Sequence, residues 1–80
     1  MEHYVVILDW ASDYECGVEI LGVTHTIEEA KVIFNNSVGD EKHHAKEFGY
    51  EIYTDCETDF DASEYGYYAK EHTRLYIQEV

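Results

Sequence analysis

The chain contains no proline and few basic residues. Five Lys and Arg stand against 18 Asp and Glu, which gives a formal net charge of −13 at pH 7. Residues 1–30 contain no Lys or Arg, and neither does the interval between Lys46 and Lys70. Proteins bind DNA, RNA and anionic membranes through Lys and Arg that neutralise phosphates. This shortage of bases argues against direct binding to nucleic acid or to a membrane.

Long apolar runs and a secretion signal are also missing. No run approaches the roughly 20 apolar residues that a bilayer crossing needs, and no charged-then-apolar leader opens the chain. We therefore expect a cytoplasmic protein. In that compartment Cys16 and Cys56 should be reduced thiols rather than a disulfide. Cys56 lies between two acids, which suppress thiolate formation, so we expect a core or half-buried thiol rather than a nucleophile.

The residues that are present predict one folded domain that spans 1–80. The hydrophobic content is 45% and the aromatic content 15%, and disordered chains are poor in aromatics. At 80 residues, however, the chain leaves little room for a water-excluding pocket beside its core. No nucleophile elbow, phosphate loop or dinucleotide fingerprint occurs. We expect a non-enzyme without a cofactor.

The first half of the chain predicts two strands and a helix. The apolar run 3–10 is typical of a central strand covered on both faces, and residues 18–25 predict its hairpin partner. Thr26 and Glu29 form a capping box, apolar residues follow at helical spacing from Ile27 to Phe48, and Gly49 suits a left-handed C-terminal cap. Gly39 weakens the helix, so one kinked helix is our first choice and two helices are the alternative.

The second half predicts further strands. Residues 50–58 alternate in polarity and residues 74–80 close the chain as a last strand, whereas 59–73 fit a loop, a short helix or an additional strand around residues 66–68. The fold class is then α+β, a small, mostly antiparallel sheet of four to five strands with one long helix on one face, in the order ββαβ(β)β.

The stretch TDCETDFDASEY, residues 54–65, concentrates acids without a base. If it continues as a strand, Asp55, Glu57, Asp59 and Asp61 form a ladder on one face with a spacing of roughly 6.6–6.8 Å. Phe60 would then point to the core. The ladder is either a docking surface for a basic partner or a solvated edge that resists aggregation.

Metal binding fits this stretch poorly. An EF-hand loop counted from Asp55 would need Gly where Phe60 stands and Glu where Gly66 stands. His43 and Glu47 share a helical face, but the five His lack the spacing of a zinc site. We expect neither a calcium nor a zinc site.

Tyrosines accompany the acids, and tyrosine is enriched at binding hot spots. Acid and tyrosine on one face suit a surface for proteins rich in Arg and Lys. The predicted partner-binding residues are Tyr53, Asp55, Glu57, Asp59, Asp61, Glu64, Tyr65 and Tyr68. The alternative is a small homodimeric structural or regulatory domain whose acidity only secures solubility.

In its size, its base-free residues 1–30 and its patch TDCETDFDASEYGYY, the chain resembles small acidic phage-encoded inhibitors of nucleic-acid enzymes. Anti-CRISPR proteins, the uracil-DNA glycosylase inhibitor and other DNA mimics belong to this class. The resemblance extends over the whole chain but includes no signature motif, so it transfers no residue roles. It implies a partner that is a nuclease, a CRISPR effector or another basic nucleic-acid-binding protein, and a location in the host cell cytoplasm.

Overall fold

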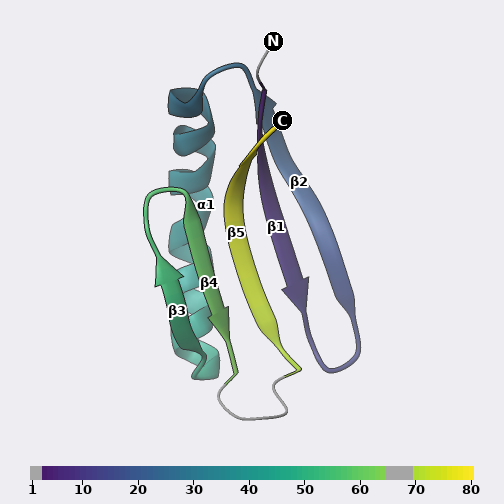
Figure 1. The fold of residues 1–80 in the computed structure, drawn as a ribbon. Coiled ribbons are helices and arrows are strands. Elements are labelled where there is room, and N and C mark those ends of the chain that lie inside the picture. Colours follow the sequence, from purple (N-terminus) through teal and green to yellow (C-terminus); the bar gives the residue numbers. More distant parts are fainter. Residues whose placement is uncertain (1–2, 65–69) are drawn as a thin grey trace.

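A computed structural model describes residues 3–64 and 70–80, which form one helix and five strands (Figure 1). The helix lies behind the sheet in the view of Figure 1. This arrangement confirms the α+β fold predicted from the sequence, with the order ββαβββ. The elements are β1 (Tyr4–Ala11), β2 (Cys16–Thr24), α1 (Ile27–Phe48), β3 (Glu51–Asp55), β4 (Asp59–Ser63) and β5 (His72–Glu79).

The sheet has the strand order β2-β1-β5-β4-β3, and every neighbouring pair is antiparallel. Two hairpins, β1–β2 and β3–β4, therefore flank β5, the last strand of the chain. The two ends of the described chain meet at one end of the neighbouring central strands β1 and β5, since the amides and carbonyls of His3 and Val80 exchange hydrogen bonds of 3.0 and 2.9 Å. The helix α1 links the two hairpins.

A single uninterrupted helix forms from Ile27 to Phe48, which confirms the prediction of one helix rather than two. The amide of Glu29 donates to the Thr26 hydroxyl oxygen (3.2 Å), and that hydroxyl donates to the Glu29 carboxylate (3.0 Å). Gly49 ends the helix at φ 71°, in the left-handed region. A Cβ built on Gly39 would meet nothing within 4 Å, so this glycine costs only intrinsic helix propensity. The two-helix alternative is wrong.

The core lies between α1 and one face of the sheet. Phe34 contributes the largest buried side chain from the helix, and Phe60 and Leu75 contribute those from β4 and β5. Phe60 is fully buried, as predicted. The complete set of buried apolar residues is Val6, Ala30, Phe34, Ala45, Phe60, Ala62 and Leu75.

The prediction that the first strand is covered on both faces is wrong. Val6 faces the helix and is buried, whereas Val5 and Ile7 point to the other side of the sheet and lie opposite Val23 and Ile20 of β2. Val23 and Ile20 are 60% and 65% exposed. We call this side, which no described element covers, the open face.

The single strand predicted at 50–58 is also wrong. The strand β3 ends at Asp55, residues 56–58 turn, and the amide of Cys56 donates to the carbonyl of Asp59 (2.9 Å) to close the β3–β4 hairpin. The ambiguous stretch 59–73 begins with β4, and β5 starts at His72, two residues earlier than expected. The strand considered around residues 66–68 falls outside the described residues.

Candidate functional site

The predicted acidic ladder is divided between two faces of the sheet. Asp55 is the cross-strand partner of Phe60, which places it on the helix side, and its carboxylate is 3.1 Å from Lys42 Nζ. Glu57 lies in the hairpin turn, 3.2 Å from Lys31 Nζ. Both acids therefore have a lysine of α1 as counter-ion.

The other two acids of the ladder lie on the open face. Arg74 Nε and Nη2 donate to the two carboxylate oxygens of Asp59 at 3.2 and 2.8 Å. These bonds are the main cause that raises the pKa of Arg74, against the opposing effect of its partial burial. The guanidinium also lies 4.2 Å from the ring centroid of Tyr76. Asp61 neighbours Arg74 across the strands and has no ion pair within 4.0 Å among the described residues.

The remaining residues of the predicted site are scattered as well. Tyr53 is 58% exposed, and its hydroxyl donates to Glu51 at 3.0 Å. The Glu64 carboxylate accepts from the amides of Lys70 and Glu71 and so ties the end of β4 to the start of β5. Tyr65 and Tyr68 fall outside the described residues. A continuous ladder on one strand face, the geometric basis of the prediction, is absent from residues 54–64.

A different acidic group forms at the end of the sheet where β1 leads into β2 and β4 ends. Burial is the largest cause that raises the pKa of Tyr50, followed by the charge and hydrogen bond of Glu71 and by the charges of Glu64 and Asp13. The Tyr50 hydroxyl donates to Glu71 at 3.3 Å. We call Asp13, Glu64 and Glu71 the acidic end. The sequence predicted Glu64 as a site residue but not Asp13 or Glu71, because the three come from separate segments of the chain.

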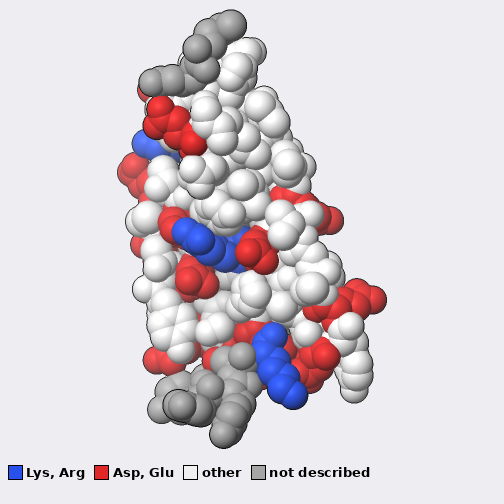
Figure 2. Space-filling view, turned by 45° about the vertical axis from the view of Figure 1, so that its right-hand side comes forward, with Lys and Arg blue, Asp and Glu red and all other residues white. Residues whose placement is uncertain are grey.

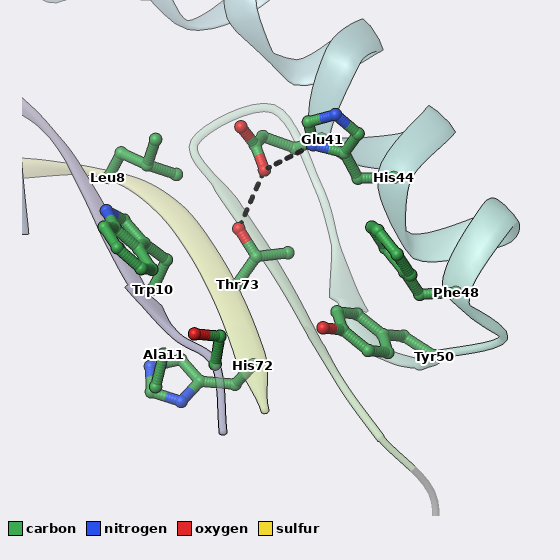
Figure 3. Close-up of a pocket in the computed structure, with 10 residues that line it drawn as sticks. Leu8, Trp10, Ala11, Glu41, His44, Phe48, Tyr50, His72 and Thr73 are labelled. Carbon is green, nitrogen blue, oxygen red and sulfur yellow. Dashed lines mark hydrogen bonds and ion pairs between the residues drawn. The ribbon is translucent and has the colours of Figure 1, made fainter. Parts of the chain in front are cut away.

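A pocket of about 290 Å³ opens beside the acidic end, between the C-terminal half of α1 and the sheet (Figure 3). Figure 3 shows the Trp10 ring on the β1 side of this space and the Phe48 and Tyr50 rings on the helix side. The lining residues are Leu8, Trp10, Ala11, Ser12, Glu41, His44, Phe48, Tyr50, His72 and Thr73.

One carboxylate enters this pocket. The side chain of Glu41 is only 14% exposed, its Oε2 accepts from the Thr73 hydroxyl at 2.8 Å, and His44 Nδ1 lies 4.0 Å from the same oxygen. Trp10 is held from the other side by Gly17, where a Cβ would come within 2.9 Å of the indole. Gly17 thus lets the indole lie close against β2.

His43 and Glu47, which were considered for metal binding, and the two cysteines all lie on the surface. His43 and Glu47 share a helical face, with Nε2 3.7 Å from the carboxylate. Residues 3–64 and 70–80 contain no group of three His, Cys, Asp or Glu arranged to hold a metal ion. Cys16 and Cys56 are both free and exposed, so the expectation that Cys56 is a core or half-buried thiol is wrong.

Comparisons of the chain with protein-family models, with curated proteins and with solved structures find no match. Among the described residues, no helix combines the length and the apolar character that a membrane crossing demands.

Proposed function

We propose that this protein is a non-enzymatic, acidic protein-binding module that blocks a basic nucleic-acid-binding surface of a nuclease or other DNA-binding protein. Its biological role would be counter-defence for a phage or mobile element, in the manner of anti-CRISPR proteins. The target is a protein, because a chain with so few exposed bases has no means of neutralising phosphates.

The observation that carries this proposal is the anionic surplus that remains after folding. Only six of the described Asp and Glu have a Lys, Arg or His nitrogen within 4.0 Å. Three of the five Lys and Arg are engaged by the hairpin acids Asp55, Glu57 and Asp59. The other acids direct an unbalanced negative potential outward, and such a potential accelerates encounter with a basic partner.

The acidic end is the part of this surface best suited to docking. Its carboxylates have no Lys or Arg side-chain nitrogen within 4.0 Å among the described residues, and Tyr14 of the adjacent β1–β2 loop is 96% exposed. An exposed tyrosine beside acids offers apolar area together with a hydroxyl. The ladder residues fit this role less well, because three of them already have intramolecular cations.

Affinity capture with a competitor tests the proposal. The immobilised protein is incubated with a bacterial lysate that has been treated with nuclease, and retained proteins are eluted with duplex DNA and identified by mass spectrometry. We expect a DNA- or RNA-binding protein that duplex DNA releases. Retention of no such protein, or retention that duplex DNA leaves unchanged, would contradict the proposal.

A matched pair of variants locates the docking surface on the captured partner. Asp13→Asn combined with Glu15→Gln removes two charges from the β1–β2 loop, and Glu28→Gln combined with Asp40→Asn removes two from exposed positions of α1. We expect about tenfold or greater weakening from the loop variant only, since close charge pairs at interfaces are worth roughly 1.4 kcal/mol or more. Equal losses would mean that net charge, rather than the acidic end, governs binding.

The open face supports a second candidate function, that of a homodimeric structural or regulatory domain. Val18, Ile20 and Val23 of the edge strand β2 are 60% to 66% exposed on this face. Figure 2, in which the β2 side is turned forward, shows largely uncharged residues there, with acids gathered around a central base and towards the margins.

Sedimentation tests this candidate with two substitutions of equal charge. Ile20→Lys disrupts the open face, whereas Val32→Lys changes a helix residue of similar exposure, 60% against 65%. A dimer that Ile20→Lys dissociates and Val32→Lys preserves would support the homodimer. A monomeric parent protein at high concentration rules it out.

A further inference from the structure

We infer that the pocket between α1 and the sheet binds one cationic side chain of the partner, an arginine, with Glu41 as its counter-ion and Trp10, Phe48 and Tyr50 as aromatic walls. This inference rests on the proposed function and deepens it, because it names the chemical group of the basic partner that the domain holds.

Glu41 supplies the charge that selects a cation. Its carboxylate is mostly shielded from solvent, and its Oε2 has two partners, the Thr73 hydroxyl and the more distant His44 ring. Its Oε1 has no hydrogen-bond partner among the described residues. A shielded carboxylate gains most from a charge-assisted hydrogen bond, and a guanidinium provides such donors in a planar fork.

The aromatic side chains supply the walls. Phe48 lies 5.9 Å from Tyr50 and 6.2 Å from His44 between ring centroids, so the three rings form a connected surface. Cations are attracted to the faces of Trp, Tyr and Phe, and aromatic cages are the usual site for such groups. The chain already uses this chemistry once, where Arg74 lies over the Tyr76 ring.

Size and surroundings narrow the occupant further. A volume of about 290 Å³ is at the lower limit of small-molecule sites, which run from roughly 300 to 1,000 Å³, and it suits one long side chain. The charges of Asp13, Glu64 and Glu71 around Tyr50 repel an anion from the mouth. A neutral apolar group would leave Glu41 without a new partner, and unsatisfied shielded acceptors are costly.

Arginine fits better than lysine for a physical reason. The guanidinium is planar and weakly hydrated, so it can stack on a ring and bond a carboxylate at the same time. The ammonium of lysine is a strongly hydrated point charge and loses more on entering a partly enclosed pocket. We therefore expect a short peptide that contains arginine to bind more tightly than the same peptide with lysine in its place.

The only tryptophan of the chain is Trp10, so its fluorescence reports on the pocket alone. The probe is a blocked pentapeptide with arginine between glycines, and the control peptide carries citrulline, which has nearly the same shape without the charge. We expect a saturable change of Trp10 emission with a dissociation constant of about 1 mM for arginine. No saturable change with arginine, or an equal change with citrulline, would overturn the inference.

Two variants on the same helix separate the pocket from general electrostatics. Glu41→Gln removes the pocket charge but keeps an oxygen acceptor for Thr73, and Glu47→Gln removes the same charge from an exposed site outside the pocket. We expect about tenfold weaker arginine binding from Glu41→Gln and less than about twofold from Glu47→Gln. Urea unfolding and circular dichroism confirm that each variant is folded. Equal effects of the two substitutions would contradict the assignment.

Failure of this inference differs visibly from failure of the proposed function. If the captured partner binds the parent and Glu41→Gln protein equally well, the pocket assignment is wrong and the proposed function stands. If no partner is captured but the peptide still changes Trp10 emission in a manner that depends on Glu41, the pocket binds a guanidinium and the proposed function is wrong.

Discussion

At Gly39 and Gly49 of the helix region an added methyl group has opposite consequences. Gly39 lies inside α1 with open space around it, whereas Gly49 has a φ of 71° that residues with a Cβ rarely adopt. We predict that Gly39→Ala raises the free energy of unfolding by about 0.5–1 kcal/mol and that Gly49→Ala lowers it by about 1 kcal/mol. Urea denaturation of the two variants beside the parent protein measures both signs. A loss of stability from Gly39→Ala would mean that the helix needs flexibility at this point.

Phe60 and Phe48 form a matched pair of phenylalanines with different burial. Phe60 is fully buried, whereas Phe48 is 63% exposed at the pocket mouth. We predict that Phe60→Ala costs about 3–5 kcal/mol of stability, which is a large share of what so small a domain possesses. Phe48→Ala should cost about 1 kcal/mol or less, because most of its ring is already in water. Similar losses in denaturation experiments would contradict the assignment of the core.

Tyr50 links stability to alkaline pH. Burial, and then the neighbouring Glu71, raise its pKa above the usual 10.0, so the folded state holds the phenol proton more tightly than the unfolded state does. The resulting stability is present below pH 10.0 and is lost as the pH rises through the higher folded pKa. We predict that the parent protein loses more stability between about pH 9 and about pH 11 than Tyr50→Phe does. If the parent protein and Tyr50→Phe lose the same stability between the two pH values, Tyr50 does not link stability to pH.

At the scale of elements, α1 was predictable and the β3–β4 hairpin was not. The helix has a start signal at Thr26, an apolar stripe and an end signal at Gly49, and these agree with one another. In residues 50–61 the alternation of polar and apolar side chains continues through the turn at 56–58, which contains no Gly, Asn or Pro. A turn without such residues has no local signal, and here the tertiary pairing of β4 with β5 determines where the strand ends.

The hairpin acids differ in how much stability their ion pairs provide. Asp59 makes a two-point contact with Arg74 and its side chain is 27% exposed, whereas that of Glu57 is 84% exposed in the turn. We predict that Asp59→Asn costs about 1 kcal/mol and that Glu57→Gln changes stability by less than about 0.3 kcal/mol. Thermal or urea unfolding ranks the two variants. If the acids formed a ladder on one continuous strand, as the sequence predicted, amides at these positions would be neutral or slightly stabilising. The Asp59→Asn variant therefore distinguishes that ladder from the hairpin with its Asp59–Arg74 pair.

At the scale of the whole molecule, the candidate sites bring together residues that are far apart in the sequence. Trp10, Glu41 and Phe48 line one pocket from two elements, and the acidic end draws on three segments. Charge composition was sufficient to indicate a basic partner as a hypothesis. It was not sufficient to say which acids remain without cations, because Lys31, Lys42 and Arg74 reach the hairpin only through the tertiary fold.

The net charge of −13 leads to a prediction about salt. Unpaired acids repel one another over long distances, and salt screens such repulsion, with a Debye length of about 10 Å at 0.1 M. Salt also weakens the exposed ion pairs, but each of these is worth only about 0–1 kcal/mol. We therefore predict that raising NaCl from about 0.02 M to about 0.5 M stabilises the fold while it weakens partner binding. Urea midpoints and binding isotherms over the same range measure the two effects. The Asp13→Asn, Glu15→Gln variant should gain less stability from salt, because it begins with less charge repulsion. If salt destabilises the parent protein instead, the local ion pairs outweigh the long-range repulsion.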